Sequence, residues 1–224
     1  MTSDQNPATG NFNPLPPSLF AAKALYASPR LLGQTLVRRT EVGEIRSRII
    51  ETESYGGIED KGSHAYGGRR TNRTEIMFGA GGHTYVYLIY GMYHCLNVVT
   101  GDIDDPQAVL IRAVEPLTPE DERKMRILRQ IRSKKAVDLS GGPGKLCRAL
   151  DIDKSLNGCL LTVPTSPLYI EAGDNVHDLP IVRSPRINID YAEEYTAKPW
   201  RFFIKGNAYV SVNDKANPPK ACYL

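Results

Sequence analysis

Short runs of apolar and alternating residues constrain the fold of this chain more than any other feature. Short runs that are rich in Val, Ile, Thr and Tyr are typical of β-strands. The five clearest are QTLVRRT (34–40), EIRSRIIETES (44–54), HTYVYLIYG (83–91), HCLNVVTG (94–101) and QAVLIRAVEP (107–116). Turns at Val42-Gly43 and Gly91-Met92 join the first two pairs. In the C-terminal third, LLTVP, LPIVRSPRI, RFFIKG and AYVSV predict further short strands.

Helical patterns are fewer. Ser18 could cap a helix over LFAAKALYA, which the Ser-Pro at 28–29 would end. The clearest helix is TPEDERKMRILRQIRSKK, where Pro119 follows a capping Thr118, acids fill the first turn and bases the last turns. Because helices and strands do not alternate as βαβ units, we predict an α+β fold with a central antiparallel or mixed β-sheet flanked by helices.

The 224 residues suffice for one domain with a sizeable core. Residues 1–17 are rich in Asn, Pro, Thr and Ser and predict a flexible N-terminal arm, which leaves residues 18–224 as a single domain. Residues 55–75 are polar and glycine-rich. They predict a loop of a length that usually carries function in compact domains.

Composition excludes some classes of protein and leaves others open. The net charge of +3 permits a polyanionic partner without requiring one. The first 20 residues lack the features of a signal peptide, and no run approaches the roughly 20 apolar residues of a membrane span. We therefore expect a soluble, cytoplasmic protein with no membrane partner. The four cysteines show no CxxC or zinc spacing, which predicts reduced thiols.

Two acidic residues in ETESY are candidates for chemistry. Glu51 and Glu53 lie two positions apart, so on a strand they share one face, and Tyr55 continues that face. A carboxylate at the end of a half-buried strand, beside a glycine-rich loop, could act as a general base. A solvated edge strand would also carry Glu at alternate positions, so the spacing leaves both interpretations open.

The histidines do not indicate a metal site. His64, His83, His94 and His177 show neither i, i+4 nor HExxH spacing, so we expect no metal. GGPGK resembles a phosphate-binding loop but lacks the Ser or Thr that should follow Lys145. Its backbone amides, with Lys145, could still hold one phosphate, or the segment could be an ordinary turn that opens a short helix.

The segment YVYLIYGMYHCLN, residues 85–97, holds four of the twelve tyrosines. Tyr85 and Tyr87 would share one strand face, whereas Tyr90 lies out of that phase and would project from a hairpin tip beside Met92 and Tyr93. An aromatic tip exposed to water needs an explanation. It could be a wedge that enters stacked bases, or a packed hairpin whose hydroxyls meet water.

Six blocks occur in a fixed order: ETESY, SHAYGG, MFGAGGHTYVYLIYGMYHCLNVV, LIRAVEP, GGPGKLCRAL and KPWRFFIKG. Together they resemble the alkyladenine (3-methyladenine) DNA glycosylase family from about Leu31 to Asp214. The resemblance implies a monofunctional DNA glycosylase of base excision repair. Such an enzyme flips alkylated purines out of duplex DNA and hydrolyses the N-glycosidic bond with an activated water. It implies that the partner is double-stranded DNA with alkylated bases. It also implies a monomer that needs no cofactor. The expected location is cytoplasmic and nucleoid-associated in a bacterium, or nuclear in a eukaryote.

The resemblance also implies roles for individual residues. Glu53 matches the catalytic carboxylate, and Arg112 matches the arginine that helps to hold the water and a phosphate. Tyr90 matches the side chain that enters the duplex. The base pocket corresponds to Tyr55, His64, Tyr87 and Asn97, and DNA contacts are expected at Met92, Tyr93 and Lys145.

Two departures from the family pattern affect the loops. Arg73 is followed by Thr74 where the family commonly has an Arg-Asn pair, and GDIDDPQ holds two extra residues relative to some relatives. An alternative from another class is a nucleic-acid binding module that stacks bases on the aromatic hairpin without catalysis. Such a module would keep the aromatic residues but would have no need of Glu53.

Overall fold

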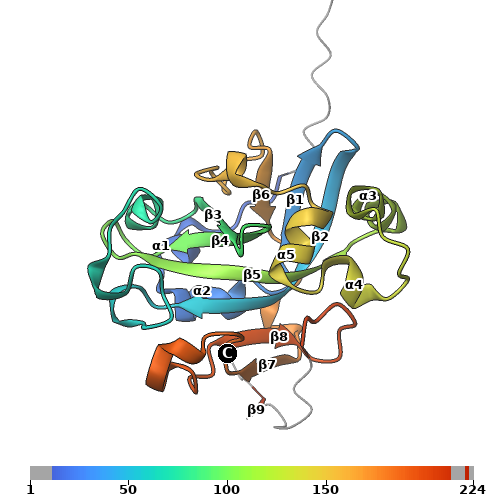
Figure 1. The fold of residues 1–224 in the computed structure, drawn as a ribbon. Coiled ribbons are helices and arrows are strands. Elements are labelled where there is room, and N and C mark those ends of the chain that lie inside the picture. Colours follow the sequence, from blue (N-terminus) through green and yellow to red (C-terminus); the bar gives the residue numbers. More distant parts are fainter. Residues whose placement is uncertain (1–11, 213–219, 222–224) are drawn as a thin grey trace, which may run out of the picture.

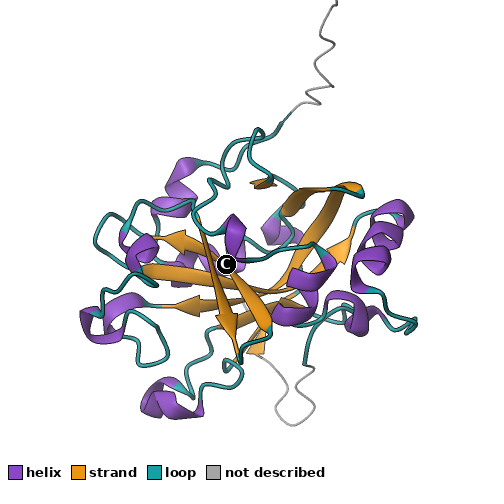
Figure 2. Cartoon of the chain, turned by 45° about the horizontal axis from the view of Figure 1, so that its top comes forward, coloured by secondary structure: helices purple, strands orange, loops and turns teal. Residues whose placement is uncertain are grey.

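A curved sheet of nine antiparallel strands organises the part of the chain that the computed structural model describes, residues 12–212 and 220–221 (Figures 1 and 2). Its strands are β1 (Thr35–Thr40), β2 (Gly43–Tyr55), β3 (Thr84–Ile89), β4 (Tyr93–Thr100), β5 (Gln107–Pro116), β6 (Leu168–Glu171), β7 (Ile181–Ser184), β8 (Arg201–Ile204) and β9 (Lys220–Ala221). They follow the order β3-β4-β5-β2-β8-β7-β9, and β1 pairs with both β2 and β6. The α+β prediction is confirmed, and the sheet is antiparallel rather than mixed.

The five clearest strand predictions are confirmed as β1 to β5, and β7 and β8 lie within LPIVRSPRI and RFFIKG. The predictions of strands over LLTVP and AYVSV are wrong. Leu161 and Val210 in these segments are buried, but their backbones follow turns instead of joining a ladder. Strand β6 was not predicted.

The helices are α1 (Pro17–Ala21), α2 (Ala24–Arg30), α3 (Pro119–Arg129), α4 (Ala136–Ser140) and α5 (Pro143–Ala149). The helix predicted after Ser18 is two helices, because the backbone is extended at Ala22 and Lys23. Ser18 lies inside α1 and caps nothing. Thr118 caps α3 as predicted. The helix ends at Arg129, because Gln130 adopts a left-handed conformation.

Part of the predicted N-terminal arm is attached to the sheet. The amide of Ala172 donates to the carbonyl of Asn13 at 2.8 Å, and the ring of Phe12 meets the edge of Tyr169. Leu15 is buried in the main core. Residues 12–17 are therefore attached to the domain through Phe12, Asn13 and the buried Leu15, while residues 1–11 of the predicted arm lie outside the described residues.

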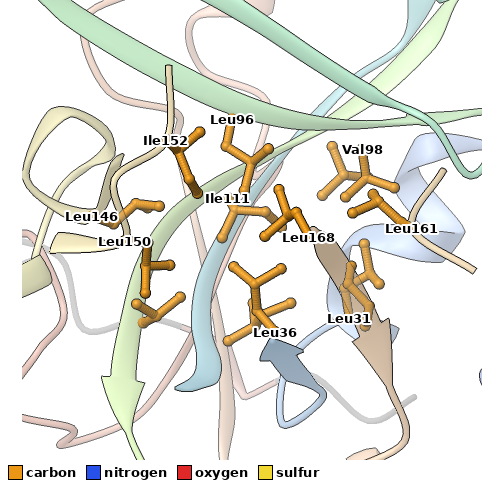
Figure 3. Packing of buried hydrophobic residues seen from close by; sticks show 14 of the residues in the cluster. Leu31, Leu36, Leu96, Val98, Ile111, Leu146, Leu150, Ile152, Leu161 and Leu168 are labelled. Carbon is orange, nitrogen blue, oxygen red and sulfur yellow. The ribbon is translucent and has the colours of Figure 1, made fainter. Parts of the chain in front are cut away.

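The main hydrophobic core lies on one face of the sheet. Figure 3 shows its leucines and isoleucines between the strands and helix α5: Leu146, Leu150 and Ile152 lie near Leu96 and Ile111. Helix α2 adds Ala24 and Ala27 to the same core. Two smaller clusters, one around Ile50 and Phe203 and one around Met77 and Phe78, cover parts of the opposite face. The remainder of that face is free to form a polar site.

A pair of β-bulges reverses the side-chain phase in the middle of the sheet. Ile49 pairs with Val114, Glu51 with Ala113 and Thr52 with Ile111, so Ile50 and Arg112 are the extra residues on β2 and β5. Upstream of the bulge the odd-numbered Ile49 enters the main core. Downstream, Thr52 turns to that side and bonds Ser28 of α2. The odd-numbered residues that follow on β2 therefore face away from the main core. A polar site can form on that opposite face.

Candidate active site

A cavity of about 510 Å³ opens between the β3–β4 hairpin, helix α5 and residues 187–191. A smaller cavity of about 40 Å³ adjoins it, and Tyr55, His64, Tyr87 and Tyr191 line both. Seven predicted site residues line the larger cavity: Tyr55, His64, Tyr87, Tyr90, Tyr93, Arg112 and Lys145. Asn97 lines the smaller one, whereas Glu53 and Met92 line neither. Residues from four separate segments of the sequence thus meet at one place.

Strand register brings the distant segments together. Tyr85 pairs with Asn97, Asn97 with Leu110, Leu110 with Glu53, and Glu53 with Arg201. Paired residues of an antiparallel sheet point to the same face. One row across five strands therefore carries the tyrosine hairpin, the asparagine, the carboxylate and a buried arginine to the same side of the sheet.

Glu53 is fully buried in a polar setting rather than exposed at the rim of the cavity. Its Oε1 accepts from the backbone amide of Ile187 at 2.8 Å and lies 3.2 Å from Nη1 of Arg112. Its Oε2 accepts from the hydroxyl of Tyr55 at 3.0 Å. A carboxylate offers about four acceptor positions. Two positions take hydrogen bonds and a third faces the Arg112 ion pair, which leaves one position on Oε2 for a further donor.

Glu51, the other candidate, is held by protein groups at both carboxylate oxygens. Its Oε1 accepts from Nε of Arg112 at 2.8 Å, from Nε of Arg201 at 2.8 Å and from the hydroxyl of Ser211 at 2.7 Å. Its Oε2 accepts from the amide of Ser211 at 2.7 Å. Burial alone would raise the pKa of Glu51, but the charges of Arg112 and Arg201 outweigh burial and lower it. Glu51 is therefore an ionised anchor between two arginines, and of its partners only Arg112 lines the cavity.

Arg112 links the two carboxylates to the cavity. Burial would lower the pKa of Arg112, but Glu53 and Glu51 together raise it above its ordinary value, so the guanidinium stays charged. Its Nε, Nη1 and Nη2 face Glu51, Glu53 and Ser211 respectively. A guanidinium has five N–H donors. Two donors therefore remain at a side chain that lines the cavity.

Aromatic rings form one wall of the cavity. The ring centroids of His64 and Tyr87 lie 4.7 Å apart at a steep angle, and those of Tyr85 and Tyr87 lie 5.2 Å apart. Nδ1 of His64 shares a hydrogen bond with the hydroxyl of Tyr85 at 2.9 Å. Burial, and then the charges of Arg73 and Arg69, lower the pKa of His64 to about 4. The wall therefore carries a neutral imidazole at physiological pH.

Tyr55 also keeps its proton. Burial, and then the charge of Glu53, raise the pKa of Tyr55 well above its ordinary value. The phenol is therefore a donor to Glu53 under all ordinary conditions, and its ring faces the cavity.

The hairpin tip is exposed and locally strained. The loop between β3 and β4 comprises Tyr90, Gly91 and Met92, which includes the predicted Gly91-Met92, and the amide of Met92 donates to the carbonyl of Ile89. Tyr90 adopts a left-handed φ of 52° and is 75% exposed. Aromatic residues rarely take this conformation, which costs on the order of 1–3 kcal/mol and clusters at functional positions. Met92 is exposed beside it, as predicted.

The glycine-rich segment 141–144 packs against the hairpin. A Cβ on Gly144 would lie 2.9 Å from the ring of Tyr93, so glycine is needed for this contact. The amides of Gly141 and Gly142 donate to protein carbonyls, and Nζ of Lys145 pairs with Asp138 at 3.2 Å. Two of the amides of this segment are therefore engaged by the protein, and phosphate binding here stays a prediction. Tyr93 and Lys145 still line the cavity.

Several residues that shape the site were missed from the sequence. The fully buried Arg186 pairs with Asp60 through both carboxyl oxygens at 2.6 and 2.7 Å. Its guanidinium lies 4.7 Å from the ring centroid of Tyr55 and 5.1 Å from that of Trp200. Nothing in the spacing of SPRIN or IEDKG marks this pair, because 126 residues separate its members. Its effect is to fix Tyr55, which in turn bonds Glu53.

Other predictions concern the cysteines, metal binding and membrane spans. Cys95, Cys147 and Cys159 are free thiols, and Cys222 lies outside the described residues. In the described ranges, no group of three or more His, Cys, Asp or Glu side chains is arranged to hold a metal ion. Within the same ranges, no helix has the length and hydropathy that crossing a membrane requires.

Comparison with known proteins gives a consistent result. The family model described as Methylpurine-DNA glycosylase (MPG) matches residues 18–208. A protein of Natranaerobius thermophilus is 48% identical over 194 residues, which cover 87% of this chain and 96% of that protein. A protein of Bacillus cytotoxicus is 47% identical over 204 residues, covering 88% and 98%. Both carry the name "Putative 3-methyladenine DNA glycosylase".

The buried network predicts a specific acid response. Because the pKa of Glu51 is lower in the folded protein than its ordinary value of 4.5, the carboxylate stabilises the fold fully above that pH. This stabilisation is lost as the pH falls through the folded value. We expect Glu51→Gln to cost roughly 3–5 kcal/mol of unfolding free energy at pH 7, and to flatten the loss of stability below pH 4.5. Chemical unfolding at a series of pH values measures both.

The exposed Glu59→Gln is the matched control for this experiment. It should leave stability and its acid dependence close to those of the unsubstituted protein. Parallel acid-dependence curves for Glu51→Gln and the unsubstituted protein would contradict the role of Glu51 as an ionised anchor.

Proposed function

The chain belongs to the methylpurine-DNA glycosylase family, and we propose from this membership that it releases alkylated purines, 3-methyladenine among them, from duplex DNA. The family makes the chain a DNA glycosylase, a hydrolase that acts on N-glycosyl bonds. Its partner would be double-stranded DNA containing alkylated bases, bound by a monomer. In bacteria, where the relatives above occur, the enzyme would work on the nucleoid and start base excision repair.

The arrangement of the cavity supports base flipping. A base inside a duplex cannot be reached, so it must be turned out at a cost of a few kcal/mol. Stacking on aromatic faces contributes on the order of 1–3 kcal/mol of favourable binding free energy per base. Tyr55, His64 and Tyr87 offer such faces. An alkylated purine is often cationic, and aromatic faces favour a cation by about 0.5–2 kcal/mol. The neutral imidazole of His64 adds no repelling charge.

The hydrolytic step is assigned to Glu53 and Arg112. A water at the free acceptor position of Oε2 donates one proton to Glu53 while its oxygen attacks C1′ of the deoxyribose. The bond between C1′ and the purine nitrogen breaks, and its electron pair leaves with the base. A cationic purine departs as a neutral molecule, so it needs no proton from the protein. The charged Glu53 also stabilises the positive sugar of the transition state.

The observation that carries this assignment is where the partners of the two carboxylates lie. Glu53 is held by Tyr55, Ile187 and Arg112, and all three line the larger cavity. Of the partners of Glu51, only Arg112 lines it, whereas Arg201 and Ser211 do not. A module that only stacked bases would have no need of Glu53 as a second buried carboxylate beside Glu51, since burying ions costs several kcal/mol each. This favours the enzyme over the binding module.

We expect Glu53→Gln to lower the single-turnover release of 3-methyladenine from methylated duplex by at least about 100-fold, the usual contribution of a general base. Binding to a duplex with an abasic-site analogue should stay within a few-fold, because the aromatic wall is unchanged. Glu59→Gln serves as the control. Release at the unsubstituted rate would remove Glu53 from the mechanism.

Tyr90→Ala tests the proposed insertion of the hairpin tip into the duplex. Since the ring is exposed, its loss should leave the thermal midpoint unchanged. It should weaken binding to a lesion-containing duplex about 5- to 150-fold, the equivalent of one stacked base. Cleavage of the same lesion in an already distorted, mismatched site should slow less. Equal effects on the two substrates would show that Tyr90 does not enter the helix.

Asn97→Ala tests discrimination against undamaged guanine. Nδ2 of Asn97 donates to the backbone carbonyl of Tyr85 at 2.9 Å, which fixes the amide against the smaller cavity. We propose that this amide crowds the 2-amino group of guanine, so its removal should raise the release of undamaged guanine from duplex DNA. The release assay on unmethylated duplex measures this. Guanine spared as before would place the discrimination elsewhere.

A further inference from the structure

Tyr191 is an exposed aromatic residue at the junction of the two cavities. It lies in the 3-10 helix Asp190–Tyr195, is 66% exposed, and lines both the larger and the smaller cavity. Tyr55, His64 and Tyr87 line the same two spaces. Its hydroxyl reaches the carbonyl of Gly62 at 3.4 Å, the long end of the hydrogen-bond range. The ring is thus presented to the cavity without being buried.

We propose that Tyr191 covers the purine once it has entered the pocket, and so sets how tightly the flipped base is held. The inference rests on the proposed function and adds a residue to it: one aromatic wall comes from the β3–β4 hairpin and a second from residues 187–191. A large exposed ring at a cavity mouth is otherwise unfavourable in water. A flat purine would cover it.

The segment that carries Tyr191 is anchored at both ends. Before it, Arg186 is held by Asp60, and the amide of Ile187 donates to Glu53. After it, Lys61 forms ion pairs with both Glu193 and Glu194 at 2.5 and 2.9 Å. Residues 60 and 61 of the long loop therefore hold the two ends of the segment, and the ring between them has a fixed place over the cavity.

The backbone of this segment is bent through unusual conformations. Asn188 and Glu193 adopt left-handed φ values of 58° and 49°, on either side of Tyr191. Such conformations cost on the order of 1–3 kcal/mol for residues other than glycine and persist where neighbouring contacts enforce them. The chain path through these two residues brings Tyr191 to the cavity.

The chemistry of the ring fits the substrate. A phenol ring stacks on a purine of any sequence context and attracts a positive charge through its π face. Partial desolvation by the surrounding protein is the main cause that raises the pKa of Tyr191, so the phenol stays neutral at physiological pH. Loss of one stacking partner weakens the hold on a base about 5- to 150-fold.

The test compares Tyr191→Ala, Tyr191→Phe and the control Tyr26→Ala, which removes a half-exposed ring on α2 away from the cavity. Single-turnover release of 3-methyladenine is measured over a range of enzyme concentrations, together with binding to undamaged duplex. We expect Tyr191→Ala to raise the enzyme concentration for half-maximal rate about 5- to 150-fold, with the maximal rate and undamaged-duplex binding nearly unchanged. Tyr191→Phe and Tyr26→Ala should match the unsubstituted enzyme.

Three results would overturn the inference. The first is an unchanged half-maximal enzyme concentration in Tyr191→Ala. The second is an equal loss of affinity of Tyr191→Ala for damaged and undamaged duplex, which would place Tyr191 on the DNA backbone. The third is a Tyr191→Phe variant that binds as weakly as Tyr191→Ala. The thermal midpoint of each variant shows that folding is intact. An unsubstituted protein that releases no 3-methyladenine would instead defeat the proposed function itself, so the two failures are distinguishable.

Discussion

The site depends on the paired bulges at Ile50 on β2 and Arg112 on β5. A regular ladder would send Glu51 and Glu53 into the main hydrophobic core, because odd-numbered residues upstream, such as Ile49, point there. Each bulge instead places two consecutive residues on the opposite face. Arg112 then lies beside both carboxylates and bonds Glu51 at 2.8 Å. The ion network depends on the bulges, since these charges would be costly to bury on the core side.

The two carboxylates divide the work between structure and chemistry. Glu51 neutralises Arg112 and Arg201 and closes the network against the backbone of Ser211. This leaves Arg112 charged and held in place, with donors to spare at the cavity. Glu53 is supported from the other side by Tyr55 and Ile187, and these are fixed by the buried Arg186–Asp60 pair. A catalytic carboxylate must keep one geometry through the reaction, and here every neighbour of Glu53 is itself restrained.

Sequence patterns were sufficient to predict strands β1 to β5, because the apolar alternation and the turns of these strands are local signals. They were also sufficient to single out Glu51, Glu53 and the tyrosine hairpin. They could not decide between the two glutamates, since that choice depends on which of their partners line the cavity after folding. The Arg186–Asp60 pair and Tyr191 escaped notice because their partners are distant in sequence. AYVSV looked like a strand because it is apolar, yet Val210 satisfies that pattern by burial in a turn.

The most direct test is the crystal structure of Glu53→Gln bound to a duplex that carries one alkylated purine. The account predicts that the purine lies in the 510 Å³ cavity against Tyr87 and His64, with C1′ close to the side chain at position 53 and a water between them. The Tyr90 ring should occupy the gap that the purine left in the helix. A purine still stacked in the duplex, or C1′ beyond the reach of a single water from residue 53, would contradict the account.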